Sequence, residues 1–81
     1  MAPVYLSLLG IKDMYLVKDS ASNAVLGKIV KKDHLPPAEQ DRDYWDIYTI
    51  NNAGNFDYLG YREFDLCAGI VYKVAKHKGV E

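Results

Sequence analysis

The chain has 81 residues, of which 49% are hydrophobic and 26% are charged, and its net charge is −1. This length allows one domain, residues 1–81, and the composition excludes disordered and fibrous proteins. A charge so close to zero provides no general attraction to nucleic acid or to a membrane surface. A single cysteine, Cys67, excludes an internal disulfide, and no export signal is recognised. The expected location is therefore the cytoplasm, that of the host cell if the protein is phage-encoded.

The first part of the chain is predicted to form short strands. Residues 3–10 fit an edge strand, and a single helical turn that begins at Pro3 is the alternative. Residues 14–18 and 24–32 flank the run Asp-Ser-Ala-Ser-Asn, which consists of turn-forming residues. These two segments are therefore expected to pair as a β-hairpin.

The middle of the chain is predicted to form a connection and a second hairpin. Residues 33–41 contain two consecutive prolines, which forbid a strand and favour an extended, solvated connection. Residues 43–50 alternate aromatic and β-branched residues with polar ones, which makes them the best strand candidate. The turn signal at 51–55 separates this strand from a further strand at 56–61.

The last part of the chain predicts one amphipathic helix that follows a turn at Gly60. Asp65 falls in its first turn and basic residues fall in its last, as the helix dipole favours, and Gly79 is placed to end it. Its apolar stripe at helical spacing consists of Phe64, Cys67, Ala68, Val71, Val74 and Ala75. We therefore predict an α+β fold, in which an antiparallel sheet of about four strands (three to five) carries one C-terminal helix on one face.

Several residues of the C-terminal half follow a strand–turn–helix pattern: Trp45, Leu59, Gly60, Tyr61, Ala68, Tyr72 and Ala75. This pattern resembles the AP2-type domain of plant factors, integrases and homing nucleases. The resemblance implies a three-stranded antiparallel sheet with a helix packed across one face. The family's strands carry arginines and tryptophans that contact DNA, whereas the corresponding strands here carry Asp43, Asp46 and Asp57. The resemblance therefore implies the fold without the DNA-reading face, because carboxylates oppose phosphate contact.

Alternation along 43–50 predicts a protein-binding face. If Trp45 and Ile47 pack under the helix, the residues between them point to the opposite side of the sheet. Tyrosine provides contact area at little entropic cost and is enriched in interface hot spots. The predicted protein-binding residues are tyrosines edged by aspartates: Tyr44, Asp46, Tyr48, Tyr58, Asp57 and Asp43, with Phe56 as a further candidate. Two other interpretations stay open, that the N-terminal hairpin covers this face or that the tyrosines only stabilise the sheet.

No pattern of residues predicts a catalytic, cofactor-binding or metal site. His34 and His77 lack ligand spacing to any other histidine or cysteine. The charged segment 41–43 has no partner nucleophile and no recessed site. Nucleic acid could be contacted by three lysines of the hairpin together with lysines of the helix. Alternation separates Lys31 from Lys28 and Lys32, and a role as solvated surface charges is favoured. The hairpin lysines are Lys28, Lys31 and Lys32, and the helix lysines are Lys73, Lys76 and Lys78.

These observations favour a small, non-enzymatic protein-binding module. By analogy with other small cytoplasmic single-domain proteins, the expected role is that of a phage or mobile-element accessory protein. Such a protein would inhibit a host defence or a host enzyme, as an anti-CRISPR does. One alternative is an AP2-like nucleic-acid-binding domain. Another is a homodimeric assembly protein in which an exposed first or last strand pairs across a two-fold axis.

Overall fold

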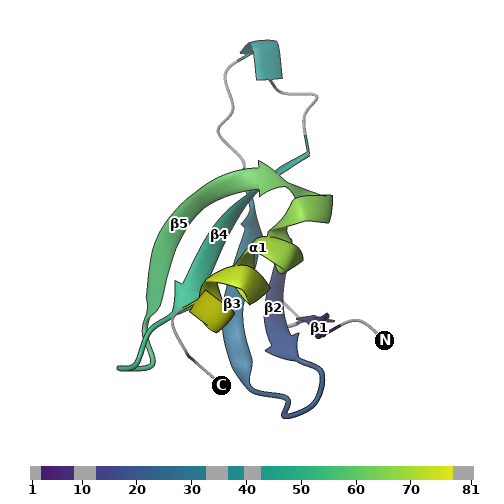
Figure 1. Cartoon of the computed structure of the whole chain (residues 1–81). Helices are drawn as coiled ribbons and strands as arrows, with labels where there is room; N and C mark the ends of the chain where they lie inside the picture. The colour runs from purple at the N-terminus through teal and green to yellow at the C-terminus, as the bar shows by residue number, and fades with distance from the viewer. Residues whose placement is uncertain (1–2, 9–12, 33–36, 40–42, 78–81) are drawn as a thin grey trace.

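The chain folds into one antiparallel sheet with a helix on one face (Figure 1). The computed structural model describes residues 3–8, 13–32, 37–39 and 43–77. The elements are β1 (Val4–Leu8), β2 (Met14–Asp19), β3 (Val25–Lys31), the 3-10 helix η1 (Pro37–Glu39), β4 (Tyr44–Ile50), β5 (Phe56–Glu63) and α1 (Phe64–His77). The sheet order β1-β2-β3-β4-β5 follows the chain, and every neighbouring pair is antiparallel. The predicted α+β class is confirmed, with five strands in the described residues.

The predicted hairpin of β2 and β3 is present, and Asp19 organises its turn. The Asp19 carboxylate accepts hydrogen bonds from the amide nitrogens of Ala21 and Ser22, at 3.2 and 2.9 Å, and from the Ser22 hydroxyl at 2.9 Å. Asn23 adopts a φ of 62°, a left-handed conformation that asparagine tolerates better than most residues. Residues of this segment therefore stabilise the turn through specific hydrogen bonds of the Asp19 side chain.

Two predicted segments of the N-terminal half have different outcomes. The edge strand predicted over residues 3–10 is confirmed as β1, Val4–Leu8, and residues 9–10 lie outside the described residues. The prediction of an extended connection over residues 33–41 is wrong for Pro37–Glu39, which form η1. Proline is accepted at the first position of a helix because the amide hydrogen that it lacks would be unpaired there. The remainder of that segment lies outside the described residues.

The prediction of a turn at Gly60 is also wrong, because β5 continues through this residue to Glu63 and α1 follows at once. The irregularity at this point is a β-bulge. Ile47 of β4 lies opposite Gly60 and Tyr48 lies opposite Tyr58, which leaves Leu59 without a partner in the register. Gly60 has a φ of 146°, which favours glycine at this position. The predicted end of the helix at residues 78 and 79 lies outside the described residues.

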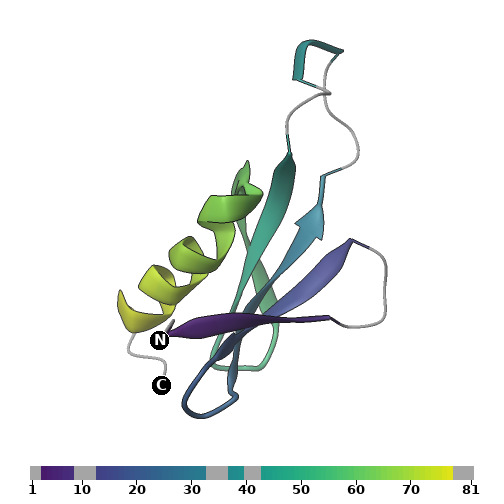
Figure 2. The ribbon, with the colours of Figure 1, turned by 90° about the vertical axis from the view of Figure 1, so that its right-hand side faces the viewer.

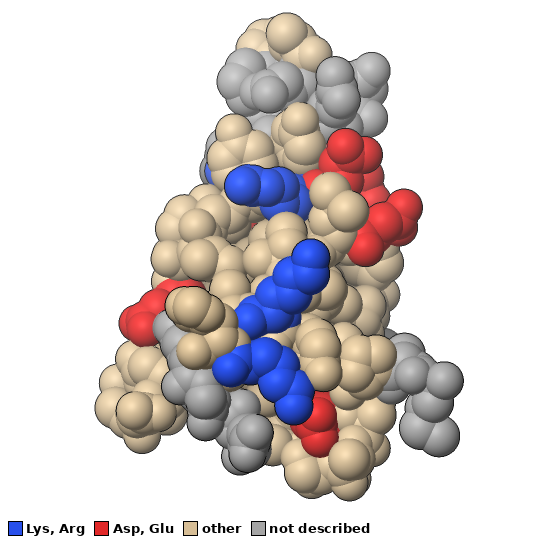
Figure 3. Space-filling view, in the orientation of Figure 1, with Lys and Arg blue, Asp and Glu red and all other residues tan. Residues whose placement is uncertain are grey.

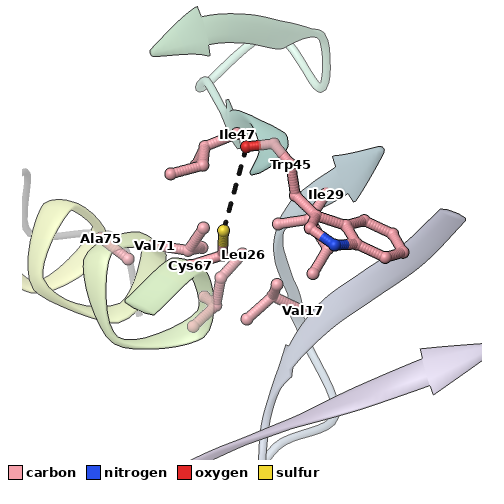
Figure 4. Close-up of a cluster of buried hydrophobic side chains, with 8 residues drawn as sticks. All are labelled: Val17, Leu26, Ile29, Trp45, Ile47, Cys67, Val71 and Ala75. Atoms are coloured by element: carbon pink, nitrogen blue, oxygen red, sulfur yellow. Dashed lines mark hydrogen bonds between the residues drawn. The ribbon is translucent and has the colours of Figure 1, made fainter. Parts of the chain in front are cut away.

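The core lies between the sheet and α1 (Figure 4). The buried apolar residues of the described chain are Val17, Leu26, Ile29, Trp45, Ile47, Cys67, Val71 and Ala75. Trp45, Ile47 and Thr49 are all buried, as the alternation predicts, and the predicted helical stripe supplies three of the core residues. The Cys67 thiol lies 4.0 Å from the Trp45 carbonyl oxygen, and burial raises its pKa to about 11.

The N-terminal hairpin extends the sheet instead of covering the tyrosine face. Figure 2 shows that the sheet is strongly twisted, so that β1 runs across the direction of β4. This twist brings Val4 and Leu6 of β1 against the core that α1 covers. The face of β4 and β5 that points away from α1 is therefore not covered by β1 or β2.

Candidate protein-binding face

Side chains on the face of the sheet opposite α1 form a cluster of aromatic rings and charges, which we call the open face. The register places Lys28, Tyr48 and Tyr58 side by side on three neighbouring strands, and Asp46 next to Tyr61. Directly opposed residues of an antiparallel sheet share a face. With the residues that contact them, the members of the open face are Lys28, Lys32, Tyr44, Asp46, Tyr48, Phe56, Tyr58 and Tyr61.

Four predicted binding residues are brought together on the open face. The Tyr58 hydroxyl donates to Oδ1 of Asp46 at 3.1 Å. The rings of Tyr48 and Tyr58 meet edge to face with centroids 5.4 Å apart, and those of Tyr44 and Tyr61 meet in the same way at 5.2 Å. The four predicted members therefore interact directly or through Tyr61.

The tyrosines of β5 are the most accessible aromatic rings of the open face. Tyr58 is 56% exposed and Tyr61 is 37% exposed, whereas Tyr44 and Tyr48 are half-buried. Desolvation, followed by the hydrogen bond to the Asp46 carboxylate, raises the pKa of Tyr58. A phenol is protonated at neutral pH, so the Tyr58 hydroxyl can donate this hydrogen bond while its ring remains accessible.

Asp43 and Asp57, the other two predicted binding residues, lie on the helix side of the sheet. Asp57 is directly opposite the buried Thr49 and accepts a hydrogen bond from the Asn51 amide at 3.2 Å. The Asp43 carboxylate accepts from Lys31 Nζ at 2.5 Å and from Trp45 Nε1 at 2.9 Å. These hydrogen bonds, that of Lys31 first, lower the pKa of Asp43. The expectation that both aspartates edge the tyrosine face is therefore wrong, and alternation alone could have separated them from it.

Two of the three hairpin lysines belong to the open face. Lys28 Nζ lies 4.9 Å from the ring centre of Tyr48 and 4.7 Å from that of Phe56. Lys32 Nζ lies 4.7 Å from the ring centre of Tyr61 and 3.7 Å from Asp46 Oδ1. These distances are typical of cation–π contacts.

The third hairpin lysine lies on the opposite side of the sheet. Lys31 Nζ is 5.5 Å from the ring centre of Trp45 and bonds to Asp43 on the helix side. The separation predicted from alternation is confirmed, so the hairpin lysines do not form one patch.

Sequence reasoning missed Tyr61, Lys28 and Lys32 as members of the tyrosine face. Tyr61 follows Tyr58 by three residues, a spacing that places two residues of a regular strand on opposite faces. The bulge at Leu59 reverses this relation and returns Tyr61 to the open face. The two lysines could be placed beside the tyrosines only with the register of β3 against β4, which local alternation does not provide.

The helix side carries a different distribution of charge. Figure 3 shows lysine and arginine side chains over the middle of this side, with acidic side chains toward its rim. The described part of the helix contributes Lys73 and Lys76 to this side, both exposed. His34, Asp41, Arg42 and Lys78 lie outside the described residues.

Two open hollows flank α1, and neither gathers a catalytic or metal-binding set. A hollow of about 390 Å³ lies between the β2–β3 turn and the end of α1, and another of about 310 Å³ lies between α1 and β5. Within the described ranges, no three histidine, cysteine, aspartate or glutamate residues are close enough to hold a metal ion. Among the helices described, none combines the length and the apolar character that crossing a membrane requires.

Comparisons with protein-family models, with curated proteins and with solved structures find no match to this chain. The resemblance to AP2-type domains therefore stays a prediction.

Proposed function

We propose that the chain is a non-enzymatic protein-binding module and that the open face is its binding surface. The observation that carries this proposal is the 56% exposure of Tyr58, which contacts the ring of Tyr48 and the carboxylate of Asp46 on the open face. In the narrower form of the proposal, the partner is a host protein that the chain inhibits.

The arrangement of the rings supports binding because it limits the entropy lost when a partner docks. Tyr48 holds one edge of Tyr58, and the Asp46 carboxylate holds its hydroxyl. Both residues of β4 stand on a strand whose other side is buried in the core. A preorganised aromatic side chain loses little rotamer freedom on binding, which favours affinity.

The charges of the open face favour a protein with mixed apolar and acidic contacts. Lys28 lies over two rings and forms no ion pair with any residue that the structure describes, whereas Lys32 lies 3.7 Å from Asp46. An acidic group of a partner near Lys28 would add a charge–charge contact at the rim of the aromatic area. Such contacts contribute more to association rate and specificity than to affinity.

The test is capture of partners from cells of the native host, followed by affinity measurements with single variants. Tyr58→Ala is expected to weaken binding at least tenfold, since truncation of a hot-spot residue costs about 2 kcal/mol or more. Asp46→Lys is expected to weaken binding as well, because it removes the acceptor of the Tyr58 hydroxyl.

The matched control is Lys73→Ala, which changes an exposed residue on the helix side. A partner that binds Tyr58→Ala and Asp46→Lys as tightly as the unchanged chain would place the interface elsewhere.

A second candidate function, binding of single-stranded nucleic acid, is favoured by one observation. Lys28 and Lys32 share a face with the tyrosines, and aromatic platforms edged by basic residues stack bases. The protein-binding role is favoured because both ammonium groups already lie against rings and Asp46 offsets one of them.

Titration of labelled single strands at low salt separates the two functions. Binding that weakens steeply with added salt and is lost in Lys28→Ala would support nucleic-acid recognition, because phosphate contacts release counterions. Under the proposed protein-binding role, no binding is expected even at low salt.

A further inference from the structure

The outer edge of β5 is an unpaired strand edge in the described part of the chain. β5 pairs with β4 on its inner side and ends the sheet order. Six of its eight residues are exposed. An exposed edge of this length presents backbone donors and acceptors that can pair with another strand.

An apolar strip lies beside this edge on the helix side. The hollow of about 310 Å³ between β5 and α1 is lined by Ile47, Leu59, Gly60, Arg62, Ile70 and Val74. Leu59 is 46% exposed, and Leu66, one turn before Ile70 on the helix, is 53% exposed. The free edge and the exposed apolar side chains thus adjoin each other.

We propose that β5 pairs antiparallel with β5 of a second copy of this chain, about a two-fold axis perpendicular to the sheet. The pairing would join two five-stranded sheets into one continuous sheet and would place both helices on the same side. This inference does not rest on the proposed role of the open face, because it is argued from the edge of β5 and from the residues of the helix side.

The bulge defines the register of the pairing. Seven residues of β5 have a partner in β4, because Leu59 has none. Gly60 is the fourth, and therefore the central, of these seven. Full overlap of two β5 strands therefore centres the axis at Gly60 and sets Asp57 opposite Arg62 and Tyr58 opposite Tyr61. A shift by one position would oppose side chains from different faces, and pleated strands do not pair in that way.

The full-overlap register is complementary in charge. Asp57 and Arg62 lie opposite Thr49 and Trp45 in β4, so both point to the helix side. The two-fold axis then produces two Asp57–Arg62 contacts, one at each end of the paired region. In the single chain, Asp57 accepts from Asn51 at 3.2 Å and Arg62 donates to the Tyr61 carbonyl at 2.6 Å. Both residues belong to the last strand of the sheet, and pairing would exchange these contacts.

The centre of the register is complementary in shape. Full overlap sets Gly60 of one copy opposite Gly60 of the other, and Leu59 of each copy lies next to this pair. Both residues line the apolar hollow. A Cβ at Gly60 would find only the Arg62 guanidinium, at 3.9 Å, so space for an incoming leucine is present. This self-complementarity is the reason to propose a second copy and not an unrelated strand as the occupant.

Sedimentation equilibrium over a concentration series tests the proposal. The unchanged chain is expected to approach twice its mass of 9.2 kDa as concentration rises. Asp57→Arg and Arg62→Asp are each expected to weaken dimerisation at least tenfold, because each places like charges at both contacts. An equimolar mixture of the two variants is expected to dimerise again, since every contact then joins an arginine to an aspartate.

Lys73→Asp and Asp65→Arg are the matched charge-reversal controls, since both residues are exposed on α1, and both variants are expected to dimerise like the unchanged chain. Circular dichroism establishes that all four variants are folded. A mass of 9.2 kDa at every concentration would overturn the proposal. So would a dimer that survives both single reversals, or a mixture that stays monomeric.

Discussion

Gly27 lies in β3 at a position that has no room for a side chain. A Cβ placed on it would lie 2.3 Å from the Tyr48 carbonyl oxygen and 2.9 Å from Cγ1 of Val71. The first of these atoms belongs to the backbone and cannot turn away. The absence of a side chain at Gly27 therefore permits the observed pairing of β3 with β4 and the approach of Val71 of α1.

Gly27→Ala is expected to destabilise the fold by about 2–3 kcal/mol, the cost typical of overpacking a core. Gly69→Ala is the matched control, because its Cβ would meet no atom within 4 Å on an exposed helical position. Alanine there is expected to stabilise the fold by about 0.5–1 kcal/mol, since it favours the helix. Urea denaturation measures both, and equal stability of the two variants would contradict the close approach at Gly27.

The turn between β2 and β3 is held by one ionised side chain, that of Asp19. Asp19 accepts three hydrogen bonds from residues 21 and 22. The bonds from Ser22, its backbone amide first, lower the pKa of Asp19 below its ordinary value of 3.8. The folded state therefore binds a proton at this carboxylate less readily than the unfolded chain does.

This difference predicts the pH dependence of the hairpin. A lowered pKa contributes stability that is complete above the unfolded value of 3.8 and is lost as pH falls through the folded pKa. The stability advantage of the unchanged chain over Asp19→Asn is therefore expected to shrink as pH falls from about 5 to about 2. Thermal unfolding across this range measures the difference.

Ser22→Ala provides the comparison for the same turn, because it removes the hydroxyl donor and keeps the two amide donors. It is expected to lose only part of the pH-dependent advantage. Unfolding profiles of the unchanged chain and of Asp19→Asn that run parallel down to pH 2 would contradict the role of the charge.

At the scale of the whole molecule, one core covers one face of a five-stranded meander. β3 and β4 pair on both sides and carry Ile29 and Ile47, which are 0% and 1% exposed. β1 and β5 pair on one side only in the described residues. The protection of backbone amides from hydrogen exchange depends on burial and on strand pairing, so we expect it to differ between the strands of the sheet.

Hydrogen exchange followed by NMR is expected to show the slowest amides in β3 and β4, with rates roughly a hundredfold or more below those of unpaired edge amides. Under the proposed dimer, the outer amides of β5 gain protection as protein concentration rises, while those of β1 do not. Uniform exchange across all five strands would contradict a core centred on β3 and β4.

The elements of the fold were predictable because their signals are local. The alternation around Trp45 predicts the buried side of β4, and the stripe through Cys67 and Val71 predicts the buried side of α1. The same alternation separates Lys31 from Lys28 and Lys32. Each of these predictions uses only the repeat of side-chain direction within one strand or one helix.

Features that depend on contacts between elements were not predictable in this way. The bulge at Leu59 places Tyr61 beside Asp46, and the register of β3 against β4 places Lys28 over Tyr48. The register of two strands is set by the packing of both strands against α1. No local pattern specifies the path of the chain that connects them.

The sequence by itself thus determined the fold class, the strands, the helix and the side of β4 that carries the tyrosines, because these follow from local periodicity. Only the tertiary structure decided which charges join the tyrosines and which strands lie at the two edges of the sheet. It placed Asp43 and Asp57 on the helix side and Lys28 and Lys32 on the open face. The physical reason is that strand pairing brings together residues from distant parts of the chain, and a one-residue bulge reverses the direction of every side chain that follows it.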